Sequence, residues 1–595
     1  MKNKGSLYYF IILIWFAGKG VFAQSERNGS LPNVILIYTD DQKRDEFNFL
    51  PEGQENGVGR NLSPHMDYLC RDGMVFTHFY VSAPVCTPSR YNLLTGNYAS
   101  RAATAKEGED GMIRLGWNVS IKEETPHIAS YLKDAGYYTG FIGKNHTYNI
   151  RGKEFVKGLD FTDRQPDDPE VLDSLKKMQN AMAEDLRNVF DYDFAGYLYK
   201  GNITTGTYPA SLGYHNLEWL VKGAYDFLDS AKVSEKPFFL HFATTLTHSP
   251  FEDGTAYTGD VRATPVGLSD DHLGIMPSRE SIIERVISAG KDSSQADITW
   301  IDDGIGAILD KLEEIGELDN TIIFYFNDNG PVPGKSSLYE VGARTFGFIW
   351  GYGQKGAICD QYISNIDIMP TVLELAQVPK NSWPSMDGVS LVDLLNNPSL
   401  TMHESIYLEI GFTRAVVKDG YKYLAFRLPE EVKNAENQAY HLGRPNKIMN
   451  LELWAEEAHP HYFDQNQLYD IRESVADTIN LYDDIDKQDL VEDLKTELRK
   501  HLCVVPGLFQ ELKPEECDVS NKHAVQAFSP QVIHQGSYLY INSLKQVSRV
   551  QLFDLQGRIL LDDITNCVHV GAFKHSVYII QVFSDGQVYT KKIVL

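Results

Sequence analysis

Cysteine is scarce in this sequence, with six among 595 residues. Small secreted domains that rely on disulfide bonds carry many more, so disulfides are not the framework of this fold. Basic residues are also few: the chain has 55 Lys and Arg against 81 Asp and Glu, which gives a formal net charge of −26. Nucleic acid and anionic membrane surfaces repel such a polyanion, and we exclude both as partners. Internal repeats and low-complexity tracts are missing as well.

Long hydrophobic runs are absent too, because the apolar stretch from Leu7 to Ala17 is too short to span a bilayer as a helix. Lys2 and Lys4 precede it and Ala23 ends a small-residue cleavage site, which predicts a secretory signal peptide over residues 1–23. No cysteine follows the cleavage point, so we expect no lipid anchor and no stable membrane anchor. The mature protein is therefore expected to be exported.

Four short apolar runs recur along the chain, and polar residues follow each of them. The runs are Val34–Tyr38, Tyr138–Ile142, Phe238–Ala243 and Thr321–Phe326. Runs that are apolar throughout are typical of strands buried on both faces of a parallel sheet. Helical patterns alternate with them, over 64–72, from 126 to 135 and over 296–315. The sequence therefore predicts an α/β fold with helices on both sides of a sheet.

The polar residues that follow these runs should share one edge of the sheet. Parallel strands present their carboxyl ends together, and ligands bind there in open α/β sheets. The residues are Asp40 and Asp41 after the first run, Lys144 and His146 after the second, His248 after the third, and Asp328 and Asn329 after the fourth. Imidazoles suit proton transfer near neutral pH, although a lone loop histidine is most often only solvated.

The acidic pairs indicate a cation site. Asp40 and Asp41 would repel each other unless a cation neutralised them, and Asp328 adds a third carboxylate. Together with the amide oxygen of Asn329 they form an all-oxygen set, which suits Ca²⁺ or Mg²⁺ and does not suit zinc. The alternative is that neighbouring aspartates merely cap a turn or helix.

Cys86 begins the peptide Cys86-Thr87-Pro88-Ser89-Arg90, which opens a helical run closed by Gly96. Pro88 suits the first helical turn, so the positive end of the helix and Arg90 both lie beside the cysteine and form a pocket for an anion. The alternative is a buried free thiol, the interpretation we give to Cys70. Cys503 and Cys517 are close enough in sequence to close a disulfide loop. His241 falls inside its strand and is expected in the core.

The peptide at 86–90 is identical to the Cys-x-Pro-x-Arg signature of sulfatases. From residue 33 to about 395 the chain resembles formylglycine-dependent (type I) sulfatases of the alkaline phosphatase superfamily, of the bacterial carbohydrate sulfatase or arylsulfatase type. Further shared motifs are Asp40-Asp41, Gly-Lys-x-His at 143–146, His-x-Pro at 248–250, Asp-Asn-Gly at 328–330, Lys335 through Arg344, Asp367 to Thr371, Asp387-Gly388 and Gln467 to Asp470. Two departures, Asn97 and Val341, touch no expected catalytic position.

The resemblance implies a mechanism. A maturation enzyme would oxidise Cys86 to formylglycine (3-oxoalanine), whose hydrate, polarised by one Ca²⁺ and deprotonated by Asp328, attacks the sulfur of a sulfated glycan. His248, with Lys335, would protonate the departing sugar oxygen. The implied catalytic residues are Cys86, Arg90, Lys144, His146, His248 and Lys335. The implied metal ligands are Asp40, Asp41, Cys86, Asp328 and Asn329, and the implied substrate-binding residues are Lys144, His248 and Lys335.

His146 would take the proton of the second hydroxyl as sulfate leaves, while Arg90 and Lys144 hold the diol and the charge around the metal. The resemblance also implies a mixed sheet sandwiched by helices. The expected domains are a catalytic domain at 24–400, a smaller α+β subdomain at 401–520 and a small β-sandwich at 525–595. The strands expected in this last segment are 538–541, 550–555, 568–570, 577–583 and 588–594. The segment resembles the C-terminal sorting domain of type IX secretion, which implies export to the periplasm or the cell surface of a Gram-negative bacterium. Arg414 to Leu424 and Gln467 to Ile471 are expected to be strands of the subdomain.

Two rival functions remain open at this point. One is a phosphonate or phosphate-ester hydrolase of the same superfamily, and the other is a non-catalytic protein that binds sulfated glycans. The sugar and the sulfated position depend on loops such as 151–215 and 425–466. In the second loop His441, Arg444, Lys447, Trp454, His459 and His461 suit contact with a sugar, whereas the plainer interpretation is a solvated insertion.

Overall fold

The computed structural model describes residues 31–108, 110–150, 159–201, 208–248, 256–270, 274–428, 455–456, 458–472 and 476–513, and, beyond these, the strands between 531 and 594. The predicted signal peptide, most of the loop at 425–466 and Cys517 lie outside the described residues.

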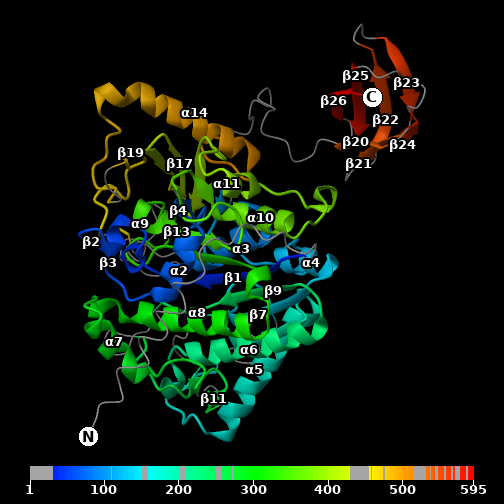
Figure 1. The fold of residues 1–595 in the computed structure, drawn as a ribbon. Coiled ribbons are helices and arrows are strands. Elements are labelled where there is room, and N and C mark those ends of the chain that lie inside the picture. The colour runs from blue at the N-terminus through cyan, green and yellow to red at the C-terminus, as the bar shows by residue number, and fades with distance from the viewer. Residues whose placement is uncertain are drawn as a thin grey trace, which may run out of the picture.

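A nine-stranded mixed sheet forms the centre of the protein (Figure 1). Its strands lie in the order β14 (Ala357–Cys359), β4 (Met74–Tyr80), β13 (Arg344–Trp350), β12 (Thr321–Asn327), β1 (Asn33–Thr39), β9 (Phe238–Ala243), β7 (Tyr138–Lys144) and β8 (Phe194–Tyr199), and β15 (Ile363–Ser364) also pairs with β4. From β12 to β8 all neighbours are parallel, whereas β13 runs antiparallel to both its neighbours. The four strands predicted from the sequence are therefore adjacent members of one parallel set.

Strand β1 shows why these runs are apolar throughout. Its alternate residues point to opposite faces of the sheet. Val34 and Leu36 belong to the core on one face, and Ile35 and Ile37 to the core on the other. All four are at most 2% exposed, so neither face of the strand tolerates a polar residue until the strand ends at Thr39. The polar residues can begin only beyond that point.

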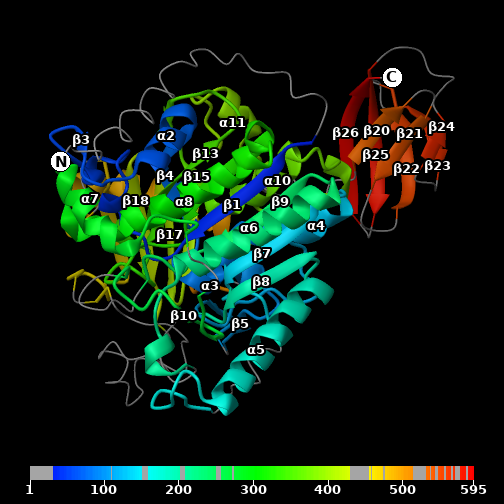
Figure 2. The same cartoon turned by 60° about the horizontal axis from the view of Figure 1, so that its bottom comes forward.

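Helices cover both faces, as Figures 1 and 2 show. One face is covered by α2 (Pro64–Asp72), α6 (Leu217–Ser234), α7 (Ile282–Ser288) and α8 (Ala296–Glu314). The core on the other face includes residues of α3 (Cys86–Thr95), α4 (Ile128–Asp134), α5 (Pro169–Asn188), α10 (Ile368–Leu375) and α11 (Val392–Asn396). The predicted helices at 64–72 and 296–315 are confirmed to within a residue. Helix α4 begins later than expected, because His127 is still extended, with φ −152°.

A second sheet has four antiparallel strands, β16 (Ile406–Ile410), β17 (Thr413–Lys418), β18 (Tyr421–Phe426) and β19 (Asn466–Asp470), with α14 (Gln488–Val504) packed on it. The prediction of one strand from Arg414 to Leu424 is wrong. The chain turns at Asp419 and Gly420, both with positive φ, and folds back as a hairpin. Earlier in the chain the described residues also form two-stranded ribbons: β2 (Gln54–Glu55) with β3 (Val58–Gly59), β5 (Lys106–Glu107) with β6 (Ile113–Arg114), and β10 (Ala263–Thr264) with β11 (Gly267–Leu268).

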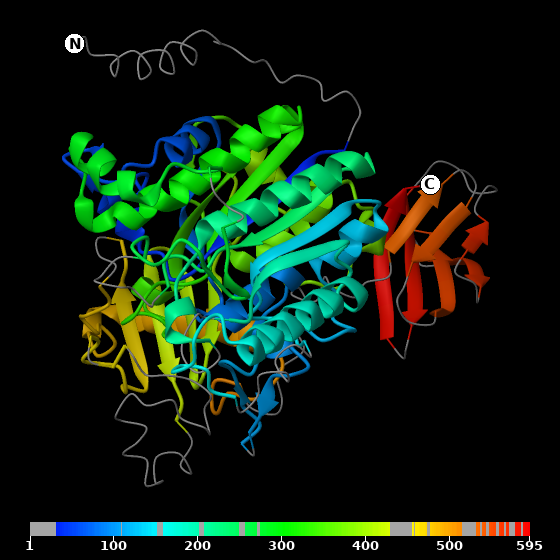
Figure 3. The ribbon, with the colours of Figure 1, turned by 90° about the horizontal axis from the view of Figure 1, so that it is seen from below.

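The C-terminal strands form two further sheets, grouped at one side of the molecule in Figure 3. One contains β20 (Gln531–Gln535), β21 (Tyr538–Asn542) and β24 (Cys567–His569); the other contains β23 (Ile559–Asp563), β22 (Val547–Phe553), β25 (Val577–Ser584) and β26 (Gln587–Val594). The sequence reasoning missed β20 and β23, and it placed the end of β22 at residue 555, two residues too far. The function of this segment as a sorting domain stays a prediction.

The described cysteines agree with the expectation of few disulfides. Cys70 is buried and free, as predicted, and Cys86 and Cys359 are also free. Cys503 is disulfide-bonded. Because Cys517 lies outside the described residues, the Cys503–Cys517 bond stays a prediction. His241 is buried within β9, as expected. Among the described residues, no helix is both long and apolar enough to cross a membrane.

A buried ionic cluster joins the second sheet to the main domain. Lys422 of β18 contacts Glu340 Oε1 at 2.7 Å and donates a hydrogen bond to the carbonyl of Leu338 at 2.7 Å. Asp477 lies 3.4 Å from the same ammonium group. Glu340 begins the short helix α9 (Glu340–Ala343) and accepts a hydrogen bond from Tyr80 of the central sheet. The cluster therefore fixes the segment that begins at Lys335.

We expect Lys422→Ala to lower the free energy of unfolding by about 3–5 kcal/mol, because it leaves the carboxylate of Glu340 buried without its main partner. Urea denaturation measures this loss. The matched control is Lys418→Ala on the same hairpin, because the pair between Lys418 and Asp493 is partly exposed and should contribute at most about 1 kcal/mol. Equal losses in the two variants would contradict the importance of the buried cluster.

Candidate active site

The polar residues predicted from the sequence converge at the carboxyl ends of the parallel strands. Asp40 and Asp41 follow β1, Asp328 and Asn329 follow the neighbouring β12, and Lys144 ends β7. The Asp41 backbone donates a hydrogen bond to Asp328 Oδ1 at 3.2 Å, across 287 positions of sequence. Residues that are far apart along the chain therefore lie together at this edge of the sheet.

Cys86 is the first residue of α3, and every residue of this helix is buried. The helix ends at Gly96, whose left-handed φ of 66° terminates it as the sequence predicted. The Sγ atom of Cys86 lies 3.5 Å from Asp40 Oδ1 and 3.6 Å from Lys144 Nζ. Burial, together with the charge of Asp40, raises the pKa of the Cys86 thiol, so the unmodified side chain stays protonated.

Arg90, one helical turn after Cys86, joins two of the carboxylates. Its Nη2 atom lies 3.0 Å from Asp40 Oδ2 and 2.9 Å from Asp328 Oδ2, and its Nε donates to Asp328 at 3.1 Å. The guanidinium also lies 5.0 Å from the ring centre of Tyr38. Arg90 is 2% exposed. Loss of Arg90 would therefore leave two buried carboxylates without this partner, which is strongly destabilising.

Two lysines neutralise the acidic pair that follows β1. Lys335 Nζ contacts both oxygens of Asp41, at 2.6 and 2.8 Å, and Lys144 Nζ pairs with Asp40 Oδ2. Asp41 adopts a left-handed φ of 57°, a conformation that aspartate accepts more readily than most residues. The two neighbouring carboxylates thus bind two different ammonium groups.

The charges shift the pKa values of the carboxyl groups in opposite directions. Burial acts to raise the pKa of Asp40, but Lys144 and Arg90 hold it well below its usual range. Burial and the negative charge of Asp40 raise the pKa of Asp328 to about 6. Asp328 is therefore the carboxyl group best suited to exchange a proton near neutral pH.

The donor set fits a cation. Ligand atoms of Asp40, Asp41, Cys86 and His248 all lie within 4.8 Å of one another. Asn329 donates through Nδ2 to Asp41 Oδ1 at 2.6 Å, and among the described residues its Oδ1 is a buried oxygen without a hydrogen-bond partner. With the amide rotated, that oxygen would point towards Asp41, and both residues would then offer oxygen ligands to a cation. Carboxylate and amide oxygens are the ligands of Ca²⁺ and Mg²⁺.

The two histidines lie at the partly exposed rim of this cluster. His248 Nε2 is 3.6 Å from Asp41 Oδ2, and burial lowers the pKa of its imidazole despite the opposing charge of Asp40. The ring of His146 packs against Trp117, with 5.3 Å between the ring centres. Lys335 Nζ in turn lies 5.8 Å from the ring centre of Trp117. All the predicted site residues are therefore in one cluster, directly or through Trp117.

Comparison with known proteins identifies the family of this chain. The family described as Sulfatase matches residues 32–378. The chain belongs to the sulfatase family. An arylsulfatase from Clostridium perfringens is 28% identical over 71% of this chain and 90% of its own length. The N-acetylgalactosamine-6-sulfatase of the dog is 23% identical over 66% of this chain and 71% of its own.

Structural similarity covers most of the chain. A solved structure described as a complex with its substrate D-glucosamine-2-N,6-O-disulfate has a TM-score of 0.51 at 17% identity, and covers 80% of this chain and 98% of its own. The similarity shows that the mixed sheet between helix layers is the sulfatase fold, as predicted. Family and relatives together identify this sulfatase as an enzyme that hydrolyses sulfuric esters.

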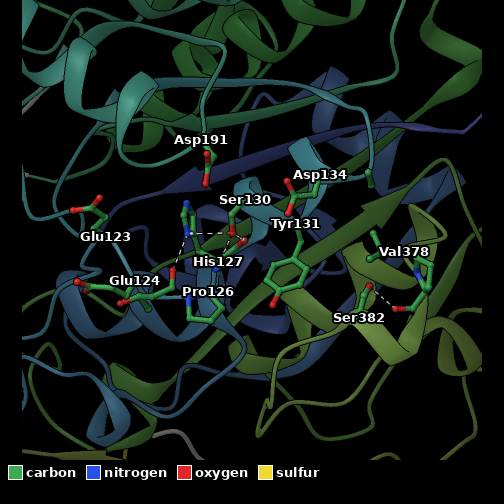
Figure 4. Close-up of a pocket in the computed structure, with 13 residues that line it drawn as sticks. Glu123, Glu124, Pro126, His127, Ser130, Tyr131, Asp134, Asp191, Val378 and Ser382 are labelled. Carbon is green, nitrogen blue, oxygen red and sulfur yellow. Dashed lines mark hydrogen bonds between the residues drawn. The ribbon is translucent and has the colours of Figure 1, made fainter. Parts of the chain in front are cut away.

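A separate cavity of about 600 Å³ lies at the N-terminus of α4 (Figure 4). Its lining includes the carboxylates of Glu123, Glu124, Asp134 and Asp191 around His127. In a sulfatase this pocket is unsuited to the ester, because its negative charge repels sulfate. The sheet edge around Cys86 instead holds the buried basic side chains Arg90, Lys144 and Lys335.

The sequence reasoning missed Trp117, because no spacing relates this loop residue to a strand end. It was also wrong about His459. That ring is 3% exposed and stacks on Tyr339, with 3.6 Å between the ring centres, so it supports the segment after Lys335 and is not available to a sugar. His461 is half-buried and pairs with Asp464 at 2.8 Å. The other residues named in that loop lie outside the described residues.

Proposed function

We propose that this sulfatase removes sulfate from a sulfated carbohydrate, and that it uses a formylglycine made from Cys86 and one Ca²⁺. The position of Cys86 is the main support for this proposal. Its side chain lies at a helix N-terminus, within 3.6 Å of both a carboxylate and an ammonium group, in a fully buried site. Because its pKa is raised, the unmodified thiol supplies little of the thiolate that a cysteine nucleophile requires.

The hydrated aldehyde would supply the nucleophilic hydroxyl, and Ca²⁺, held by Asp40, Asp41, Asp328 and Asn329, would supply positive charge beside it. The chain's own residues provide the remaining functions. Arg90 fixes the orientation of Asp40 and Asp328 through three hydrogen bonds. Asp328 accepts a proton from the attacking group.

Lys144, Lys335 and His248 bind the ester. Lys144 contacts both Asp40 and Cys86, so its ammonium group would lie beside the attacked sulfur. Lys335 and His248 lie together on Asp41, on another side of the cluster. There they donate hydrogen bonds to the sulfate ester, and His248 gives a proton to the departing oxygen. His146, at the Trp117 side, receives the proton that is released when sulfate leaves.

The substrate class rests on the relatives and on the predicted export. The similar N-acetylgalactosamine-6-sulfatase and the structure bound to a disulfated glucosamine are both named for sulfated sugars. A predicted signal peptide and a C-terminal segment that resembles a secretion sorting domain favour a role in glycan breakdown, in the periplasm or at the cell surface. A maturation enzyme would be needed before or during export.

We expect Cys86→Ala to lower turnover of an aryl sulfate by at least about 10⁴-fold, because it removes the nucleophile. Mass spectrometry of the wild-type Cys86 peptide, from a host that carries the maturation enzyme, should show an aldehyde. The matched control is Cys70→Ala, which removes another buried free thiol and should retain activity. Active wild-type enzyme that contains only the unmodified thiol would contradict formylglycine. An inactive protein with that thiol would instead support the non-catalytic glycan-binding alternative.

Calcium should stabilise the folded enzyme. After treatment with EDTA, addition of Ca²⁺ at about 100 times its Kd should stabilise the protein by about 2.7 kcal/mol, as measured by thermal unfolding. We expect Asp41→Asn to weaken Ca²⁺ binding at least tenfold, about 1.4 kcal/mol. Asp292→Asn, at a carboxylate paired with Arg60 away from the site, should not change it. Full activity after exhaustive chelation, or stoichiometric zinc, would overturn this assignment.

Substrate assays separate the proposal from the phosphoester rival. We expect hydrolysis of 4-nitrophenyl sulfate to exceed that of 4-nitrophenyl phosphate. A panel of defined sulfated mono- and disaccharides then identifies the sugar and the sulfated position. If the site is a pocket, sulfate release from a terminal sulfated sugar should exceed release from the parent polysaccharide. Equal rates per sulfate would show an open cleft, and preference for phosphate would favour the rival hydrolase.

A further inference from the structure

His215 is a buried histidine that the resemblance does not account for. It stands directly before α6 and is 2% exposed. Its Nδ1 atom lies 2.8 Å from the hydroxyl oxygen of Thr245, which is also buried. Thr245 belongs to the segment that leaves β9 and leads to His248 three residues later. The contact therefore joins the start of α6 to the loop that carries a proposed proton donor.

The loop itself is a tight turn around Thr245. The backbone of Thr244 donates to the carbonyl of Tyr38 in β1 at 3.1 Å, and the backbone of His248 donates to the carbonyl of Thr245 at 3.2 Å. The Thr245 side chain is thus fixed relative to both the sheet and His248. A displacement of Thr245 would move His248 relative to Asp41, its 3.6 Å neighbour.

His215 is held rigidly from its other side. Asn216 caps α6 by accepting a hydrogen bond from the backbone of Trp219 at 2.9 Å, and its amide donates to the carbonyl of Ala263 at 2.9 Å. The backbone of Asn216 also donates to the hydroxyl of Tyr199 at the end of β8. The Tyr199 carbonyl accepts from the backbone of Asn145, the residue between Lys144 and His146. One network of hydrogen bonds therefore connects the start of α6 with the loop that carries Lys144 and His146.

The chemistry of the ring indicates more than packing. Burial lowers the pKa of His215 to about 3, so the imidazole is neutral and one nitrogen donates while the other accepts. The pKa also responds to His248, through its charge and through a contact with its backbone. Among the described residues the Nε2 atom is buried without a hydrogen-bond partner. A phenylalanine would fill the same space without that cost, so the Nδ1 contact explains a histidine here.

We infer that His215 is a positioning residue for His248: through Thr245 it fixes the loop that places the His248 imidazole beside the departing oxygen of the ester. The inference rests on the proposed role of His248 as the proton donor. His215 need not touch the substrate. Its loss would affect the step in which the leaving group takes a proton, and would affect binding of the sulfate group much less.

The experiment compares two esters whose leaving groups differ. The oxygen of 4-nitrophenyl sulfate leaves as a stable phenolate and needs little protonation, whereas a sugar or alkyl sulfate needs an acid. We expect His215→Phe to lower kcat at least about tenfold on the alkyl ester and no more than about twofold on the nitrophenyl ester, a fraction of the 10²–10⁴-fold contribution of a general acid. KM should change little for either ester.

Further variants keep the test valid if His215→Phe folds poorly. Thr245→Val removes the other partner without a change in size and should show the same dependence on the leaving group, whereas Thr245→Ser should retain activity. His215→Asn, which offers a polar atom near the Nδ1 position, should restore activity on the alkyl ester. His241→Phe is the matched control, because it replaces another buried histidine with a similarly low pKa, about 3, and should affect both esters equally.

The outcomes separate the inference from the proposed function. A selective loss on the alkyl ester in both His215→Phe and Thr245→Val supports the inference. Equal losses on both esters, or full activity on both, would overturn it while the sulfatase reaction stands. If the matured wild-type enzyme hydrolysed neither ester, the proposed function would fail, and the role of His215 with it.

Discussion

Neutralisation of three buried carboxylates is the constraint on which the site depends. Asp40, Asp41 and Asp328 are buried together at one edge of the sheet, where a charged carboxylate without a cationic partner costs free energy. Lys144 and Arg90 hold the pKa of Asp40 well below its usual range, Lys335 pairs with Asp41, and the pKa of Asp328 rises to about 6. No member can be removed in isolation, because its partner would be left as an unpaired buried charge.

The fold explains how such a cluster can form at all. β1 lies between β12 and β9, and all three run parallel, so their carboxyl ends meet. Every residue of β1 is buried, so a charged residue is not tolerated within the strand, and the first aspartate comes directly after Thr39. Helix α3 brings Cys86 to the same edge from β4. The segment after Lys335 is fixed from the second sheet by Lys422, so that sheet contributes to the site although it carries none of the predicted catalytic side chains.

The sequence predicted the elements whose burial restricts them to apolar residues. It did not predict contacts that form only when distant segments pack together. Strands such as Val34–Tyr38 could be predicted because both faces are covered, and the convergence of Asp40 with Asp328 followed from parallel pairing. The hairpin turn at Asp419 and Gly420 was missed, because apolar residues continue on both sides of it. The stacking of His459 on Tyr339 could not be foreseen, since it joins segments more than a hundred residues apart. Trp117 and His215 likewise act only through tertiary contacts.

The overall negative charge of the protein affects how the active site can attract an anionic substrate. A chain with a formal charge of −26 repels an anionic ester at long range, although salt screens that repulsion beyond about 10 Å. Attraction must therefore come from contacts within the site. There the three cationic side chains offset the three carboxylates, so the protein alone provides no net positive charge for sulfate. A bound divalent cation would change that balance by two units. It would make the site attractive to a singly charged sulfate ester while the surrounding surface stays acidic.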